Sequence, residues 1–134
     1  MADLETKRAW LWFALSALAA TLLLLVAVSN AAYEVTSPSW LTWHVLLRKS
    51  YSVVAFGLIG FLFARTAHAF GRAWGTAQVS VTVGGYSALI ELCQRLFSGA
   101  RESLEQQSFD VAMGLAGGAL GALLARGSQR GPRV

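Results

Sequence analysis

Four polar side chains that could do chemistry together lie between residues 91 and 110, at the ends of the last two apolar segments. They are Glu91, Gln94, Arg101 and Asp110. Ionised groups are costly at membrane depth, so their presence there indicates a functional site. A guanidinium binds phosphate or carboxylate well, and the two carboxylates could hold Arg101 or act as acid and base. We expect a candidate site for a lipid-linked or headgroup phosphate, or for another polar envelope molecule.

The same residues also allow a purely structural interpretation. Glu91 and Arg95 have the i,i+4 spacing of a helical ion pair. Arg101 and Asp110 could form an interfacial clamp that fixes the last two helices without binding anything. The sequence leaves both interpretations open.

Other catalytic or metal-binding patterns are absent from the sequence. It contains no H-E-x-x-H, no G-x-S-x-G and no P-loop. His44 and His68 fall on opposite sides of the membrane in the topology expected below, and Cys93 has no second thiol. We therefore expect no metal site and no cofactor, and the sequence does not decide whether the chain is an enzyme.

The composition is that of a membrane protein. Of the 134 residues, 55% are apolar and 13% are charged, and the mean hydropathy is +0.51, whereas a soluble domain is about a quarter charged. The net charge of +4 is spread singly between apolar runs, without the basic stripe that nucleic-acid binding requires. The predicted fold is an all-α integral membrane bundle of about four helices, with the lipid bilayer as partner and no nucleic acid.

The predicted transmembrane helices cover about residues 9–29, 48–70, 74–96 and 109–125 of one membrane domain, 1–134. The first contains 20 residues without charge, Ala9 to Val28. A cleaved signal peptide is the alternative, because small residues follow at Ser29-Asn30-Ala31. The apolar core of a signal peptide is usually about 7 to 15 residues, which favours an uncleaved helix.

The second predicted helix is the least apolar near its ends. Its charge-free part, Tyr51 to Ala64, is 14 residues long. Arg48, Lys49 and Arg65 must then extend their side chains to the headgroup layers. A re-entrant segment is the alternative.

Small and polar residues recur at steps of three or four in the last two segments, which places them on one face of each helix. In the third segment they are Ser80, Gly84, Ser87, Glu91 and Gln94, and in the fourth Asp110, Gly114, Gly117 or Gly118, and Gly121. Small residues let membrane helices approach closely. Because the connection from Phe97 to Ser108 is short, we expect antiparallel neighbours in which Gly84 meets Gly117 or Gly121.

The basic residues predict the orientation. With four spans, seven of the 11 Lys and Arg residues lie on the side of the termini and four on the other. The positive-inside rule then places both termini in the cytoplasm, in a multi-pass protein of the cell inner membrane. The polar site would face the cell envelope.

The pattern E-x-x-Q, then R, then D-x-x-x-G-x-x-G-x-x-x-G resembles the VanZ-like family of small bacterial membrane proteins. The resemblance covers about residues 49–125, with its specific part at 91–121. The matching residues are Glu91, Gln94, Arg101, Asp110, Gly117 and Gly121. The family is named for a link to resistance to the glycopeptide teicoplanin, which is the phenotype that the resemblance implies.

Two positions depart from that family pattern. Gly114 stands where members commonly have asparagine. At the second helix the D-K-x-x-H motif is replaced by Arg48-Lys49-Ser50-Tyr51-Ser52, in which Lys49 alone is retained, with Phe56 and Gly60 as candidate following residues. An activity that depends on that histidine is not expected here.

Three functions remain as hypotheses. The first is a membrane protein that binds an envelope lipid or polar ligand from the outer side. The second is a membrane-embedded enzyme that acts on a lipid-linked envelope precursor, and the third is a structural subunit of a membrane complex. The sequence specifies no oligomeric state.

Overall fold

Long α-helices make up almost all of the computed structural model, which describes residues 1–29, 44–97 and 104–130. This described part contains four helices and no strand, so the predicted all-α fold is confirmed. The helices are α1 (Ala2–Val28), α3 (His44–Ala69), α4 (Thr76–Phe97) and α5 (Leu104–Gln129).

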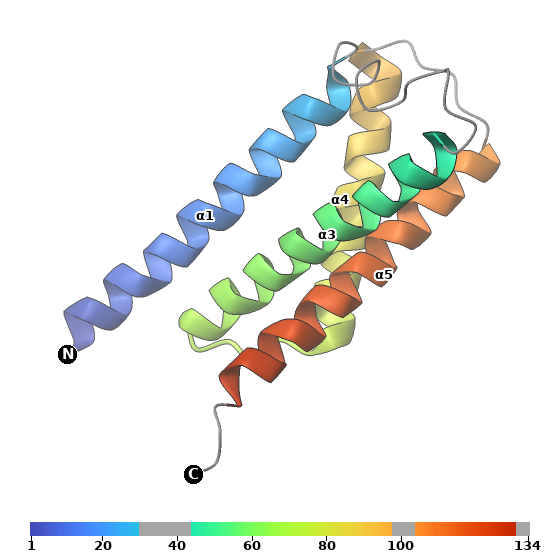
Figure 1. Cartoon of the computed structure of the whole chain (residues 1–134). Coiled ribbons are helices and arrows are strands. Elements are labelled where there is room, and N and C mark those ends of the chain that lie inside the picture. Colours follow the sequence, from blue (N-terminus) through green and yellow to red (C-terminus); the bar gives the residue numbers. More distant parts are fainter. Residues whose placement is uncertain (30–43, 98–103, 131–134) are drawn as a thin grey trace.

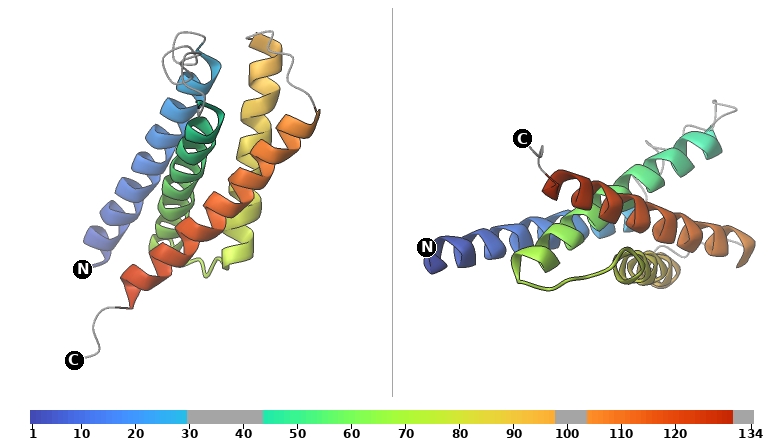
Figure 2. Two further views of the ribbon diagram at one scale, coloured as in Figure 1. Left: turned by 45° about the vertical axis from the view of Figure 1, so that its right-hand side comes forward. Right: turned by 90° about the horizontal axis from the view of Figure 1, so that it is seen from below.

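The helices run alternately up and down. The beginning of α1, the end of α5 and the linker from α3 to α4 at residues 70–75 lie at the same end of the bundle (Figure 1). α5 crosses both α3 and α4, and α1 lies along α3 (Figure 2). The shared core consists of Phe56, Ile59, Val79, Val83, Ile90 and Ala122. We call the end of the bundle where α1 begins and α5 stops the terminal end, and the opposite one the distal end.

Three segments are long and apolar enough to cross a membrane: α1, Ser50–Ala69 of α3 and Gln107–Gln129 of α5. α3 is one continuous helix of 26 residues, or about 39 Å, without the break that a re-entrant segment needs. α4 is 22 residues long, about 33 Å, but its serines, threonines, Gln78, Glu91 and Gln94 lower its hydropathy. It is therefore absent from these three.

α1 is apolar on all its faces and is the helix least covered by the rest of the bundle. Only 6% of its most apolar 18-residue window is buried. A helix that is hydrophobic all round faces lipid when its neighbours leave it uncovered. Its outward side chains include Leu11, Leu15, Leu18, Leu22 and Leu25.

A few polar contacts fix α1 against the other helices. The hydroxyls of Ser16 and Thr66 are 2.8 Å apart, and the guanidinium of Arg65 lies 4.8 Å from the ring centre of Trp12. Tyr86 of α4 donates a hydrogen bond to the main-chain oxygen of Ala20. Ser16 is buried, so its pairing with Thr66 satisfies two hydroxyls that lipid could not.

Candidate functional site

The close packing of α4 on α5 positions the candidate site. The Ser80 hydroxyl donates to the main-chain oxygen of Leu115 at 2.7 Å, and the Ser87 hydroxyl donates to that of Asp110 at 3.0 Å. Ser87 is 1% exposed. Side-chain hydroxyls can reach a neighbouring helix backbone only where small residues bring the two helices together, and Gly84 and Gly114 lie between these contacts.

The glycines of α5 form two rows rather than one. A Cβ built on Gly114 would lie 2.6 Å from Cβ of Ser87, so this glycine faces α4. A Cβ on Gly117 would lie 2.7 Å from Cβ of Phe56, and one on Gly121 would overlap the backbone of Gly57 in α3. The expected contact of Gly84 with Gly117 or Gly121 is therefore wrong.

The correction has a simple geometric reason. Successive residues of a helix are about 100° apart, so two glycines four residues apart share a row, and neighbouring glycines do not. Gly118 therefore shares the row of Gly114 that faces α4, and its Cβ would meet Cβ of Val83 at 2.8 Å. It also lies close to α3, because a Cβ on Gly60 would meet Cα of Gly118 at 2.8 Å. One face of α5 thus packs on α3 and the adjacent face on α4.

A groove opens between α4 and α5 at the distal end, and we call it the distal groove. Its volume is 460 Å³. Its polar lining residues are Glu91 and Arg95 from α4, and Gln107 and Ser108 from the first turns of α5; the apolar ones are Ala88, Leu92 and Val111. The guanidinium of Arg95 donates a hydrogen bond to the side-chain oxygen of Gln107. The groove therefore brings a carboxylate, a guanidinium, an amide and a hydroxyl together.

The structure separates the residues that the sequence grouped. Glu91 is half-buried and lines the distal groove. Gln94 instead lies toward α1, where its side-chain nitrogen donates to the main-chain oxygen of Ala27 at 2.8 Å. Asp110 is half-buried and offers its main-chain oxygen to Ser87, but it is not among the residues that line the groove. Arg101 lies outside the described residues.

Gln94 departs from the expected cluster because α4 has two neighbours at its distal end. α1 approaches α4 there, as the contacts from Tyr86 and Gln94 show. Ala27 is in the last turn of α1, where carbonyl groups lack partners within their own helix. The amide side chain satisfies one of these carbonyls, which makes it a link between two helices.

Three polar groove residues were not among the predicted site residues: Arg95, which was considered only as an ion-pair partner of Glu91, and Gln107 and Ser108. The connection between the last two helices was placed at Phe97 to Ser108, whereas α5 begins at Leu104. Most of the first residues of α5 are polar and its apolar run begins only at Phe109. The hydrophobic pattern therefore did not indicate that the helix begins earlier. The spacing of Gln107 three residues before Asp110 was the available signal, because it places the two side chains one helical turn apart.

Comparison of the chain with family models, curated proteins and solved structures found no match. The function is therefore inferred from the geometry of the distal groove.

Proposed function

We propose that this protein is a multi-pass membrane protein that binds the polar head of an envelope lipid in the distal groove. The observation that carries the proposal is that Glu91 and Arg95 line one groove of 460 Å³ between two packed helices. A groove with both charges suits a head that has an anionic group and hydrogen-bond donors. Phosphate with a neighbouring hydroxyl or amine has this chemistry.

Each polar group of the groove has a role in this binding. The Arg95 guanidinium offers two parallel donors to a phosphate, and its hydrogen bond to Gln107 holds it in place before binding. Glu91 accepts hydrogen bonds from hydroxyl or amine groups of the head, because a carboxylate is an acceptor only. The Ser108 hydroxyl can donate or accept at the rim.

The surroundings of the groove favour a lipid over a water-soluble ligand. Leu92 lines the groove and is 51% exposed, and Leu89, Leu96 and Phe109 are exposed on the same two helices. An apolar patch beside a charged groove suits a molecule with a polar head and acyl chains. The head would enter the groove while the chains lie along α4 and α5.

The proposed orientation puts the groove on the outer side of the inner membrane. Within the described residues, the terminal end carries Lys7, Arg8, Arg65, Arg72, Arg126 and Arg130. The positive-inside rule then places the terminal end, and with it both termini, in the cytoplasm. α4 would also cross the membrane, in addition to the three apolar segments, with its polar groups turned to α5 and α1. The resemblance to the VanZ-like family predicts a change in teicoplanin sensitivity.

Native mass spectrometry of the full chain with its co-purified lipids tests the proposal. Wild-type protein is compared with Glu91→Gln and Arg95→Gln, and Glu105→Gln is the matched control, because Glu105 is exposed in the first turn of α5 and does not line the groove. We expect Arg95→Gln to weaken phospholipid binding by about fivefold, which is the effect of one basic charge near an anionic surface. We expect Glu91→Gln to weaken it as well, because a neutral amide replaces the charged acceptor of the head's hydroxyl or amine groups. An unchanged lipid complement in both variants would overturn the proposal.

A further inference from the structure

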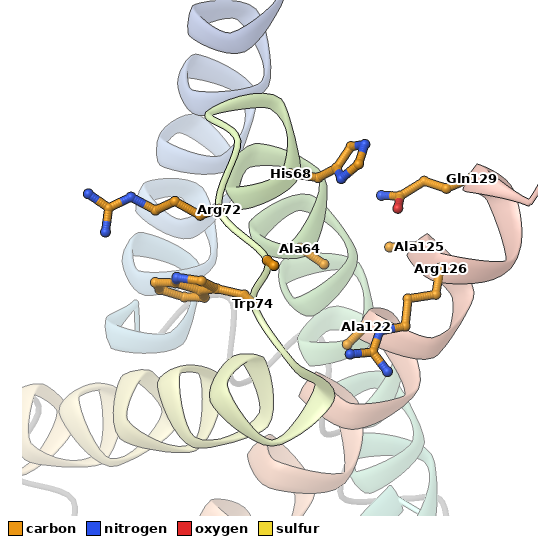
Figure 3. Close-up of a pocket in the computed structure, with 9 residues that line it drawn as sticks. Ala64, His68, Arg72, Trp74, Ala122, Ala125, Arg126 and Gln129 are labelled. Carbon is orange, nitrogen blue, oxygen red and sulfur yellow. The ribbon is translucent and has the colours of Figure 1, made fainter.

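A second cavity lies at the terminal end, and we call it the terminal pocket. It is formed by the last turns of α3 and α5 and by the linker between α3 and α4, and its volume is 240 Å³. Figure 3 shows its lining residues, which come from α3, from α5 and from the linker between α3 and α4. The lining residues are Ala64, His68, Arg72, Ala73, Trp74, Ala122, Ala125, Arg126 and Gln129.

The pocket exists because alanines occupy its floor. Ala122 and Ala125 are buried, at 2% and 0% exposure. They share one face of α5 with Arg126 and Gln129, since the four positions follow the steps of three and four residues of a helix. The floor is therefore small and apolar, while the mouth carries long polar side chains.

The mouth of the pocket is cationic. Arg72, Arg126 and His68 line the pocket together with Gln129 and Trp74, and none of the nine lining residues is acidic. All these groups can donate hydrogen bonds, and the arginines carry a permanent positive charge. Figure 3 shows the His68 ring and the Gln129 amide pointing toward one another, with Arg126 on the neighbouring turn of α5. Arg72 points away from His68 and Gln129 (Figure 3), but it is exposed, so its long side chain can turn toward a ligand. The chemistry of this mouth fits an anion.

The nearby Arg65 has different partners. Its Nη1 donates to the Ser128 hydroxyl at 3.2 Å, and its guanidinium lies over the ring of Trp12. This arginine links α1, α3 and α5, so its charge serves helix packing. Arg72 and Arg126, in contrast, are exposed at the pocket mouth.

We propose that the terminal pocket binds the phosphate group of an anionic membrane lipid on the side of the termini. The pocket lies at the ends of two segments that are apolar enough to span a membrane, which is the depth of lipid headgroups. Phe70 and Trp74 are exposed beside it, at 42% and 37%, and tryptophan is enriched at that interface. Basic pockets between helices on the cytoplasmic side bind anionic heads.

This inference does not depend on the function proposed above. The distal groove and the terminal pocket lie at opposite ends of the bundle and share no residue. The groove contains a carboxylate and selects a head with donors, whereas the pocket selects for negative charge alone. Arg95→Gln should therefore leave binding at the pocket unchanged.

Titration of the detergent-purified full chain with phosphatidylglycerol, followed by native mass spectrometry, tests the pocket. The variant Arg72→Gln with Arg126→Gln is compared with Arg8→Gln combined with Arg130→Gln, which removes the same charge at the same end from exposed residues outside the pocket lining. Each pocket arginine should contribute about fivefold, so the pocket variant should bind about 25-fold more weakly. The control variant should stay within about twofold, since its exposed charges do not contact the headgroup and are screened by water and salt.

A second variant and a second probe complete the test. Gln129→Glu adds a carboxylate to the mouth at an exposed position, and it should weaken phosphatidylglycerol binding by about fivefold or more. Far-UV circular dichroism verifies that each variant is folded. Equal losses in the pocket and control variants would overturn the site, because a general basic surface would then explain binding. Competition by millimolar inorganic phosphate would overturn the assignment to a lipid, in favour of a soluble phosphate.

Discussion

The side-chain amide of Gln94 in α4 donates a hydrogen bond of 2.8 Å to the main-chain oxygen of Ala27 in the last turn of α1. The two residues are 67 positions apart in the sequence, so this bond joins the beginning of the chain to its second half. Gln94 was predicted to bind a ligand, but this hydrogen bond shows that its side chain connects α4 to α1.

Replacing Gln94 by leucine should weaken the docking of α1. The change removes the donor and leaves the Ala27 carbonyl without this partner, and hydrogen bonds between membrane helices are worth about 1 kcal/mol. Thermal unfolding in detergent, followed by circular dichroism, measures the loss of stability. Gln129→Leu is the control, because Gln129 is exposed at the end of α5. Equal stability of the two variants would contradict the role of Gln94.

Substitution of Gly60 by alanine should destabilise the crossing of α3 and α5. The added Cβ would lie 2.8 Å from both Cα and the main-chain oxygen of Gly118, so two backbones would have to separate. Overpacking of this kind costs about 1 to 3 kcal/mol.

Gly85→Ala is the matched control for that substitution. Nothing lies within 4 Å of the Cβ position of Gly85, and alanine favours a helix over glycine by up to about 1 kcal/mol. The two alanine variants should therefore shift the unfolding temperature in opposite directions. A shift of the same sign and size in both would mean that the glycine contact between α3 and α5 is not tight in the membrane.

Cysteine labelling should place the two ends of α5 on opposite sides of the membrane. In a Cys93→Ser background the chain has no other cysteine, so Ser108→Cys and Gln129→Cys each introduce a single thiol at an exposed position. A membrane-impermeant maleimide should label residue 108 in intact cells and residue 129 only after permeabilisation. Labelling of both in intact cells would exclude the proposed topology.

The coupling between Arg101 and Asp110 stays a prediction from the sequence. If the two side chains form a buried pair, Arg101→Ala should cost about 3 to 5 kcal/mol, and adding Asp110→Asn should recover part of the loss. A double-mutant cycle measures the interaction directly. A coupling below about 0.5 kcal/mol would show that the two residues act independently, as exposed pairs usually do.

The sequence predicted the helices well, because long apolar runs determine membrane helices almost by themselves. It also singled out Glu91, which lines the distal groove, since a carboxylate inside such a run is conspicuous. It could not choose the partner of each helix face. The spacing of Gly114, Gly117 and Gly121 determines where each glycine lies around the axis of α5. It does not determine whether α3 or α4 packs on that side.

The polar ends of the helices were harder to predict than their centres. α5 begins at Leu104, ahead of its apolar run, so Gln107 and Ser108 were assigned to a loop. Gln94 was grouped with Glu91 because both lie on one side of α4. That face of α4 packs on α5 along most of its length and on α1 at its distal end. The spacing of residues in the sequence cannot predict this change of neighbour.

The sparse coverage of α1 has a consequence for biogenesis. Its few polar contacts on the other helices are made with Arg65, Thr66, Tyr86 and Gln94, which are all synthesised after it. When α1 leaves the ribosome, none of these partners has emerged, so α1 must enter the bilayer on its own hydrophobicity. It is the most apolar of the three segments that could span a membrane, whereas the more polar α4 follows later in the chain, when α1 and α3 are already available as partners.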